Sequence, residues 1–432
     1  MSDQLSVDLT DLSAFEGGDD HRLFRHLREH APLHWNDEPG GRGFWSVTRY
    51  GDIRAIASDH RAFSSAEGTQ IADRRAEGHG DPSIHNMDPP RHSTLRQLIV
   101  PHFRPARIRK LEDEVVAIID ALLDEVLSAD AAPGGAPGAP GAPGAPGVPG
   151  DPGDPGGTVD FVSAVAARLP LLVVGRFLGA PARDCADLLT WTNQIASEDP
   201  EYSAGPETAA KARDEVFAYF RELEAERRRD PRDDLVTALL HAEVKGRPLS
   251  LAQRNANHLL LLVAGNETTR NLLSGGVEAL HRWPGQWEAL VADPGRIPAA
   301  VEEAARWVSP VLCMRRTATR DVELHGRTIG AGQKVVLWFC SGNRDGEVFP
   351  RPDRFIGDRE PNDHLGFGWG VHACLGAHLA RFETALFLRR LIQRGLRVEL
   401  QAEPERLRSN FFRGIKRLPV RLVASHARAP YA

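Results

Sequence analysis

The chain has 432 residues, of which 41% are hydrophobic and 26% are charged, and its net charge at pH 7 is −6. This length and composition allow a large buried core, while the small net charge gives no basis for nucleic acid or an anionic membrane as a partner. No run of about 18 apolar residues occurs, and the polar first 30 residues are unlike a signal peptide, so neither a membrane span nor a secretion signal is predicted.

The cysteine and lysine contents point to a bacterial cytoplasm. The four cysteines show no paired spacing, which suits a reducing compartment: Cys185, Cys313, Cys340 and Cys374. Only five of the 53 Lys and Arg residues are lysines, a bias that accompanies GC-rich bacterial genomes.

The first 130 residues are predicted to contain both helices and strands. We expect a helix over 21–30 and strands over 32–35 and 43–50. Residues 66–86 are polar and glycine-rich without periodicity, which predicts a loop or a short mobile helix. From 90 to 127 apolar residues recur at helical spacing, which predicts helix.

Residues 133–157 interrupt this pattern with a low-complexity insertion. Glycine recurs at every third position from Gly135 to Gly156, with Ala-Pro in most gaps, which is the composition of collagen. A triple-helical stalk that makes trimers is one interpretation. We favour a surface loop inserted in a single domain that spans residues 1–432, because so short a segment must return to that domain at both ends.

The helical pattern then resumes. Helices are predicted over 161–178, 182–197 and 207–228, and the acidic, turn-rich residues 198–206 between the last two are a candidate lid tip. A long helix is predicted over 251–280.

The last third of the chain adds one more helix and several strands. The helix is expected over residues 298–307, and the strands are expected from Arg316 onward, over 322–324, 327–329 and 334–339, and within 396–423. The sequence as a whole therefore predicts a mainly α fold with small peripheral β-sheets.

The long helix contains polar residues where apolar ones would be expected. Its centre reads Ala264-Gly265-Asn266-Glu267-Thr268-Thr269. A small Ala-Gly pair lets a flat ligand lie against the backbone, and a threonine in a helix can hydrogen-bond the carbonyl four residues earlier. The alternative is an ordinary buried ion pair and a core threonine, and the segment alone does not decide between them.

Residues 367–376 read Phe-Gly-Trp-Gly-Val-His-Ala-Cys-Leu-Gly and lie before an amphipathic run, 377–390, that is predicted as helix. The free N–H groups of that helix point toward Cys374, which is expected to lower the pKa of its thiol. A thiolate on a tight turn suits the axial position of a heme iron. Three glycines let the backbone approach a bulky group and take conformations closed to other residues: Gly368, Gly370 and Gly376.

The loop has two other interpretations. A lone cysteine is usually a small buried apolar residue. A zinc site is the other alternative, but zinc favours paired ligand spacings, and the local residues do not supply a familiar set: His364, His372, Cys374 and His378.

The pattern Phe-x-x-Gly-x-His-x-Cys-x-Gly resembles the heme-binding loop of cytochrome P450 monooxygenases. Four motifs occur in the order and spacing of that family, and the resemblance covers residues from about 31 to 423. It implies a P450 fold around heme b, with Cys374 as the thiolate ligand of the iron. The Pro/Gly insertion departs from the family pattern but touches no motif.

The resemblance also assigns roles to residues outside the cysteine loop. Glu267 and Thr268 would relay protons to bound dioxygen, with Glu267 as the link to solvent. Ala264 and Gly265 would lie against the heme, and Phe367, Gly368, Gly370 and Gly376 would hold the loop. The heme propionates would contact His92, Arg96, Arg316 and His372.

A structural ion network would contain Glu303, Arg306 and Arg354. Substrate contacts would be Leu261, Ala264, Val311, Leu312, Phe411 and Phe412, with lids near 66–85 and 195–207.

The activity implied by the family is insertion of one oxygen atom from O2 into a hydrophobic molecule, by hydroxylation or epoxidation. A terpenoid, steroid-like or polyketide natural product of secondary metabolism would be the substrate. The chain has no flavin or iron–sulfur motif, so its electrons would come from NAD(P)H through a ferredoxin reductase and a ferredoxin. Arg104, Arg107, Arg109 and Lys110 would attract that acidic partner, and the alternative is a solvated basic run without a partner. A monomer is expected.

Two other functions remain possible on the sequence. A heme-thiolate peroxygenase or isomerase would need no reductase, but the intact Glu267-Thr268 pair argues against it. A non-enzymatic heme sensor or trimeric scaffold should carry further signalling segments, and none is visible.

Overall fold

The computed structural model describes residues 7–73, 83–130, 157–196, 199–244 and 246–425. Helices predominate in this part of the chain, and the strands form small sheets of five, three and two strands. The predicted mainly α fold is therefore confirmed. Residues 133–156 of the Pro/Gly-rich insertion, residues 74–82 of the first expected lid and residues 197–198 of the second lie outside the described residues.

The helices have the following bounds: α1 Ser13–Glu16, α2 Asp20–His30, α3 Tyr50–Ser58, α4 Arg91–Ile99, α5 Pro105–Ile108, α6 Glu112–Asp130, α7 Arg168–Leu178, α8 Cys185–Ala196, α9 Pro206–Arg229, α10 Leu235–Leu240, α11 Leu251–Arg282, α12 Pro284–Ala292, α13 Ile297–Val308, α14 Phe339–Gly342 and α15 Ala377–Gln393.

The strands have the following bounds: β1 Leu33–Asn36, β2 Phe44–Val47, β3 Phe63–Ser64, β4 Val159–Asp160, β5 Glu243–Val244, β6 Arg247–Pro248, β7 Cys313–Ala318, β8 Val322–Leu324, β9 Arg327–Ile329, β10 Lys334–Trp338, β11 Leu396–Leu400, β12 Glu405–Arg406, β13 Ile415–Arg417 and β14 Pro419–Ala424.

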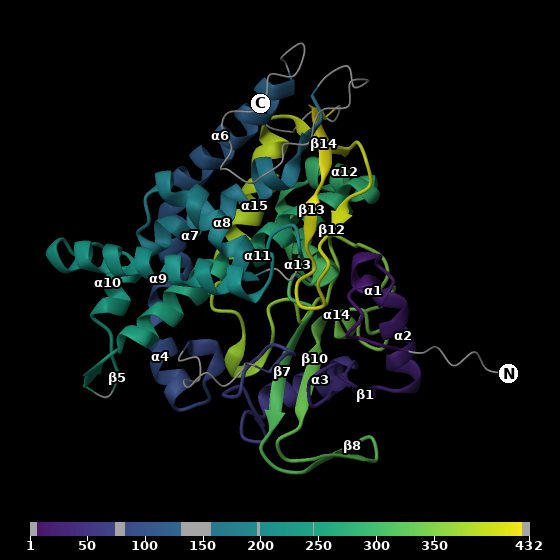
Figure 1. Cartoon of the computed structure of the whole chain (residues 1–432). Coiled ribbons are helices and arrows are strands. Elements are labelled where there is room, and N and C mark those ends of the chain that lie inside the picture. Colours follow the sequence, from purple (N-terminus) through teal and green to yellow (C-terminus); the bar gives the residue numbers. More distant parts are fainter. Residues whose placement is uncertain (1–6, 74–82, 131–156, 197–198, 245, 426–432) are drawn as a thin grey trace.

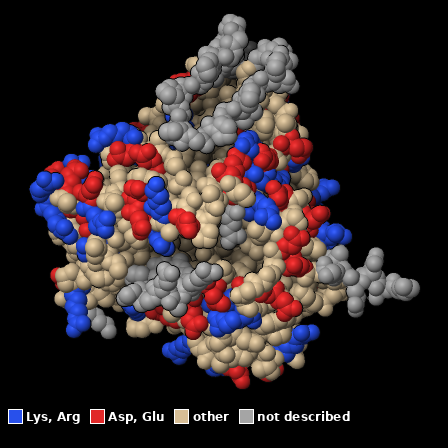
Figure 2. All heavy atoms as spheres, in the orientation of Figure 1, with Lys and Arg blue, Asp and Glu red and all other residues tan. Residues whose placement is uncertain are grey.

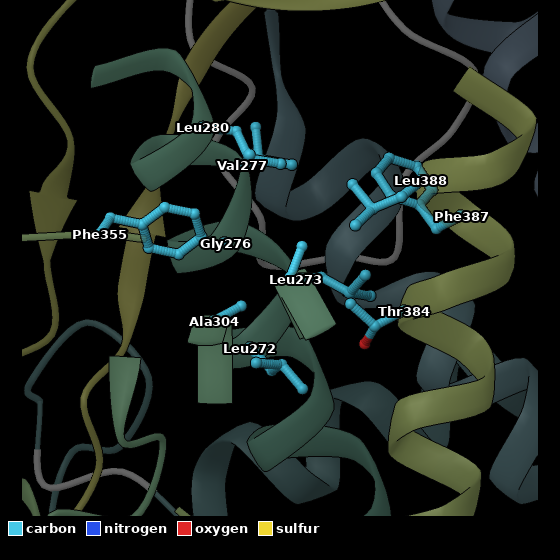
Figure 3. A pocket seen from close by; sticks show the side chains of 11 residues that line it. Leu272, Leu273, Gly276, Val277, Leu280, Ala304, Phe355, Thr384, Phe387 and Leu388 are labelled. Carbon is cyan, nitrogen blue, oxygen red and sulfur yellow. The ribbon is translucent and has the colours of Figure 1, made fainter. Parts of the chain in front are cut away.

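Helix α11 runs through the centre of the molecule and contacts α7, α8, α9, α13 and α15 (Figure 1). Its first turn is fixed by a capping box, in which the Ser250 hydroxyl accepts from the N–H of Gln253 and the Gln253 side chain accepts from the N–H of Ser250. One face of its C-terminal half carries the apolar residues Leu272, Leu273, Val277 and Leu280 and is turned toward α13 and α15, as Figure 3 shows. The cavity left there is only about 10 Å³, the lower limit for one water molecule, so this region is core.

The five-stranded sheet has the order β1-β2-β10-β7-β3 and lies with α1–α3 beside the helical part (Figure 1). Strand β10 pairs parallel to β2 and antiparallel to β7, so β10 joins the last third of the chain to its N-terminal segment. On the face shown in Figure 2, acidic and basic side chains are intermingled, in keeping with the small net charge. None of the described helices has both the length and the hydropathy needed to cross a lipid bilayer.

Several predicted elements differ from the observed ones. The helix expected over 90–127 is broken into α4, α5 and α6, with 3₁₀ turns between them, because Pro101 and Pro105 lack the N–H that a continuing helix needs. The strand expected over 43–50 ends at Val47, and α3 begins three residues later. The strand expected to begin at Arg316 instead begins at Cys313.

Candidate active site

One face of α11 is open although the helix lies in the centre of the molecule. Ala264 is exposed, and Leu260, Val263 and Thr268 are partly exposed, whereas most of the helix from Leu261 onward is buried. Leu260, Ala264 and Thr268 follow one another at intervals of four residues, and Val263 is three residues after Leu260, so the side chains lie on one face. Solvent therefore reaches this face of α11, and the space in front of these four side chains is called the hollow below.

The cysteine loop presents Cys374 as an exposed side chain just before α15. The N–H of Cys374 donates to the carbonyl of Phe367 over 2.8 Å, which closes the loop. Gly368 and Gly370 have φ values of 68° and 71°, and a Cβ on Gly370 would lie 2.4 Å from the carbonyl oxygen of Ala57. At these two positions glycine is required by the backbone.

Gly376 differs from the other loop glycines. Its φ is −87°, and a Cβ there would meet only the ring of Phe103 at 4.0 Å. The expectation that all three glycines take conformations closed to other residues is therefore wrong for Gly376, which instead precedes the first turn of α15.

The thiol of Cys374 does not have the lowered pKa that the helix N-terminus was expected to give. Burial among protein atoms raises its pKa, and this effect outweighs the N–H of Gly376 and the guanidinium groups of Arg96 and Arg381, which lower it. The residue is nevertheless exposed to solvent, which contradicts a cysteine packed in the core. A metal ion at that position would supply the positive charge that stabilises the thiolate.

Four side chains predicted to hold carboxylates lie close to this loop. The rings of His92 and His372 are 4.2 Å apart, and Arg96 donates to the carbonyl of Ala373 over 2.7 Å. Arg316 is 4% exposed, and among the described residues it forms no salt bridge with a carboxylate. Burial lowers the pKa of Arg316 to about 10, that of His92 to about 4 and that of His372 to about 2.

This arrangement fits a bound dianionic group. Nδ1 of His92 and Nε2 of His372 are buried without a hydrogen-bond partner in the described residues. A buried guanidinium without a carboxylate is costly unless an anion reaches it. The two carboxylates of a heme would supply the missing acceptors, so these residues suit the cofactor that the sequence predicts.

Gly265 has a different neighbour from the one expected. A Cβ on this residue would lie 2.6 Å from Cγ2 of Val174, so glycine is needed here for close packing of α11 on α7. We therefore correct the expectation that Gly265 is small in order to admit the heme. Ala264, which is exposed on the open face of α11, has the position expected of such a residue.

Thr268 and Glu267 have different surroundings. The Thr268 hydroxyl donates to the carbonyl of Ala264 over 2.7 Å, as the sequence predicted for a helical threonine. Glu267 is only 4% exposed and forms an ion pair with Arg270 at 2.9 Å. Glu267 is thus buried and paired with Arg270 in this structure, and its role as the link to solvent stays a prediction.

Arg270 was not among the predicted site residues. It donates to the side chain of Asn193 on α8 over 2.9 Å and lies 5.7 Å from the ring of Tyr202. The spacing Glu267-Thr-Thr-Arg270 is the same as that of Glu303 and Arg306, and it could have suggested the pair.

The segment between α8 and α9, which was a candidate lid tip, is held on strand β13 by ion pairs. Lys416 lies 3.1 Å from Asp199 and 3.5 Å from Glu201, and Arg417 pairs with Glu201 as well. The described part of the first lid is held in a similar way, since Lys334 and Arg315 each lie 2.9 Å from Asp73.

The expected substrate contacts divide into two groups. Val311 and Phe411 are partly exposed, and Leu261 and Phe412 are 8% and 6% exposed. Leu312 is 1% exposed and packs in an N-terminal apolar cluster with Phe24 and Trp338. Leu312 is therefore a core residue, which corrects the prediction that it contacts substrate.

The structural ion network also differs from the prediction at one position. Glu303 and Arg306 are fully buried and form two contacts of 2.8 Å. Glu303 also forms an ion pair with the guanidinium of Arg359, at 3.0 Å. Arg354 is exposed and contributes only its backbone carbonyl, which accepts from Arg306 and Arg359. The third charged side chain of the network is therefore that of Arg359 and not that of Arg354.

The residues of the alternative zinc site have other contacts. His364 bonds to Glu302 over 3.0 Å, and His372 lies against His92. In the part of the chain that the structure describes, no three His, Cys, Asp or Glu side chains are grouped to hold a metal ion.

Comparison with known proteins gives consistent results. The family model "Cytochrome P450" matches residues 297–421. Linalool 8-monooxygenase of Pseudomonas putida is 37% identical over 415 residues, covering 93% of this chain and 95% of the relative. A methyl-branched lipid omega-hydroxylase of Mycobacterium tuberculosis is 36% identical over 428 residues, covering 96% and 94%. The structure of a Mycobacterium marinum cytochrome P450 in complex with pseudoionone has a TM-score of 0.84, with 34% identity and coverage of 97% and 98%.

Proposed function

The chain belongs to the cytochrome P450 family and is a heme-thiolate monooxygenase, and from this premise we propose that it hydroxylates an uncharged, branched terpenoid with electrons from a ferredoxin. The observation that carries the proposal is the open face of α11, where Ala264 and Thr268 border a hollow. We assign Cys374 as the axial ligand, because it is the exposed cysteine of the glycine loop. When bound, the heme activates O2, so that one oxygen atom enters the substrate and the other leaves as water.

The residues around the hollow support an uncharged substrate. Leu260, Val263 and Ala264 on α11 offer only apolar side chains, and Thr268 offers one hydroxyl. A ligand in such a site is selected by shape and apolar area. The names of the relatives above, which concern linalool, a methyl-branched lipid and pseudoionone, all describe hydrophobic molecules with methyl branches. This common chemistry favours a terpenoid over a polyketide.

A titration of the purified heme protein tests the substrate class. Linalool and pseudoionone should each shift the Soret band of the oxidised protein, because a ligand in the hollow displaces water from the iron. An unbranched primary alcohol of similar size is the uncharged control and should produce a weaker shift. A shift with the unbranched alcohol alone would contradict the proposed substrate class.

Within the proposed function, Thr268 supports proton delivery to the O2 site. Its hydroxyl already donates to Ala264, so its oxygen can accept a hydrogen bond from a proton-donating water. Thr268→Ala should leave heme and substrate binding intact and uncouple the reaction, so that NAD(P)H is consumed while peroxide rises and product falls. The change in coupling is expected to be on the order of tenfold or more, the scale of a lost proton-transfer group. The measurement is product and peroxide formed per NAD(P)H.

A neighbouring threonine gives a matched control for this prediction. Thr269 is 3% exposed and lies beside Thr268 on the same helix, so Thr269→Ala removes a hydroxyl away from the open face. Coupling should be unchanged in this variant. Glu267→Gln should instead slow NAD(P)H consumption, because it removes the carboxylate that exchanges protons when the ion pair with Arg270 opens. Unchanged coupling in Thr268→Ala would make Thr268 a packing residue.

The proposed ferredoxin surface lies on the side of the cysteine loop. Helix α5 packs on α15, and Phe103, at the start of the basic run, lies beside Gly376. Arg104, Arg109 and Lys110 are exposed. Arg107 forms an ion pair with Asp233 at 2.6 Å, so its charge is partly offset.

Reversing the three exposed charges should weaken reduction by the ferredoxin. We expect Arg104→Glu/Arg109→Glu/Lys110→Glu to lower the association rate about tenfold or more at low salt, with a smaller difference at high salt. The measurement is the rate of reduction by ferredoxin at two ionic strengths. Arg107→Glu is the comparison variant and should have a smaller effect per charge. Equal rates for the triple variant and the unmodified protein would place the docking surface elsewhere.

A further inference from the structure

A partly exposed ion pair between α13 and α15 lies next to the cysteine loop and has no role in the function proposed above. Arg381 on α15 donates two hydrogen bonds to Glu302 on α13, from Nε over 2.5 Å and from a terminal nitrogen over 2.8 Å. The two side chains are 35% and 30% exposed. This bidentate geometry fixes the plane of the guanidinium, which a single contact would not do.

A histidine holds the carboxylate of Glu302 from the other side. Nδ1 of His364 accepts from the N–H of Gly366 over 3.0 Å, so the proton of the neutral ring is on Nε2. Nε2 is 3.0 Å from Glu302 and donates to it. Although burial raises the pKa of Glu302, His364 and Arg381 together lower it to about 2, so this carboxylate stays ionised at neutral pH.

The guanidinium of Arg381 lies against the cysteine loop itself. Its central carbon is 4.2 Å from the centre of the Phe367 ring, a cation–π contact. The carbonyl of Phe367 in turn accepts from the N–H of Cys374 over 2.8 Å. Arg381 and Arg96 are the two guanidinium groups whose charges act on the sulfur of Cys374, and of these Arg381 has a carboxylate partner.

We propose that Glu302 and Arg381 form a charge pair that sets the reduction potential of the Cys374-ligated heme, with Glu302 as the positioning residue that holds Arg381 over Phe367. The proposal rests on the assignment of Cys374 as the ligand. A positive charge near the sulfur favours the reduced iron, and a negative charge favours the oxidised iron. The pair keeps these two effects in balance in the unmodified protein.

This reasoning predicts opposite shifts for the two single variants. Glu302→Gln leaves the charge of Arg381 uncompensated and should raise the reduction potential. Arg381→Gln leaves the charge of Glu302 uncompensated and should lower it. Each variant changes one unit charge near the heme. At an effective dielectric constant of about 20, this is expected to change the ratio of ferrous to ferric protein on the order of tenfold. The double variant should return close to the unmodified value.

An anaerobic redox titration of the purified heme protein, followed at the Soret band, tests these shifts. Arg381→Lys keeps the charge and should stay closer to the unmodified potential than Arg381→Gln. Glu125→Gln, which removes a carboxylate from the Arg168 ion pair between α6 and α7, is the control and should not shift the potential.

The outcomes separate this inference from the assignment of the ligand. The reduced, CO-bound spectrum of each variant should keep its red-shifted Soret band, and its absence in the unmodified protein would instead overturn the ligand assignment. Shifts of the same sign in the two single variants, or no shift in either, would overturn the charge-pair proposal. Loss of heme in Glu302→Gln would show a structural role for Glu302 and would overturn it equally.

Discussion

Replacement of Cys374 by alanine is expected to abolish the red-shifted Soret band of the reduced, CO-bound protein. That band requires a thiolate on the iron, and no other cysteine of the chain can replace this one. Cys313 and Cys340 are each 1% exposed in the core, and Cys185 begins helix α8, so none of the three lies in the glycine loop. The loss should be complete and is measured by the spectrum and by heme content.

The matched control for this prediction is Cys185→Ala. Cys185 is the one other cysteine that is partly exposed, and it begins helix α8, away from the loop. This variant should retain the full spectrum and heme content. A red-shifted band in Cys374→Ala would show that another residue is the ligand, and it would remove the basis of both proposals above.

Replacement of Glu303 by glutamine is expected to lower the free energy of unfolding by about 3–5 kcal/mol, the cost of breaking a buried charge network at one partner. Glu303 accepts from Arg306, Arg359 and the N–H of Ile356 over 2.8–3.0 Å. The neutral amide would leave the charges of Arg306 and Arg359 uncompensated in the interior. Urea unfolding followed by circular dichroism measures the change.

The neighbouring acid provides the control for this stability prediction. Glu302 is on the same helix but is 30% exposed, so Glu302→Gln should cost at most about 1 kcal/mol. Arg354→Ala should have little effect on stability, because the exposed Arg354 contributes only its backbone carbonyl to the network. A large loss in Arg354→Ala with a small one in Glu303→Gln would contradict the observed network.

The elements that could be predicted are those whose signals are local. The long helix over 251–280 is observed as Leu251–Arg282, because its capping residues and apolar periodicity lie within the segment itself. The helix after Cys374 and the strands within 396–423 were likewise found. The helix expected over 90–127 is not continuous. Its apolar residues keep a helical spacing throughout, but two prolines within the segment interrupt the backbone hydrogen bonds.

The sequence by itself determined the family, the cofactor and the position of the reactive loop, because these depend on short motifs whose residues are close together in the chain. The tertiary structure decided which charges meet. Arg359 rather than Arg354 reaches Glu303, Arg381 meets Glu302, and burial raises the pKa of Cys374 against the local effect of its helix. Ion pairs and desolvation depend on distances and packing between segments far apart in the chain, so no local pattern could fix them.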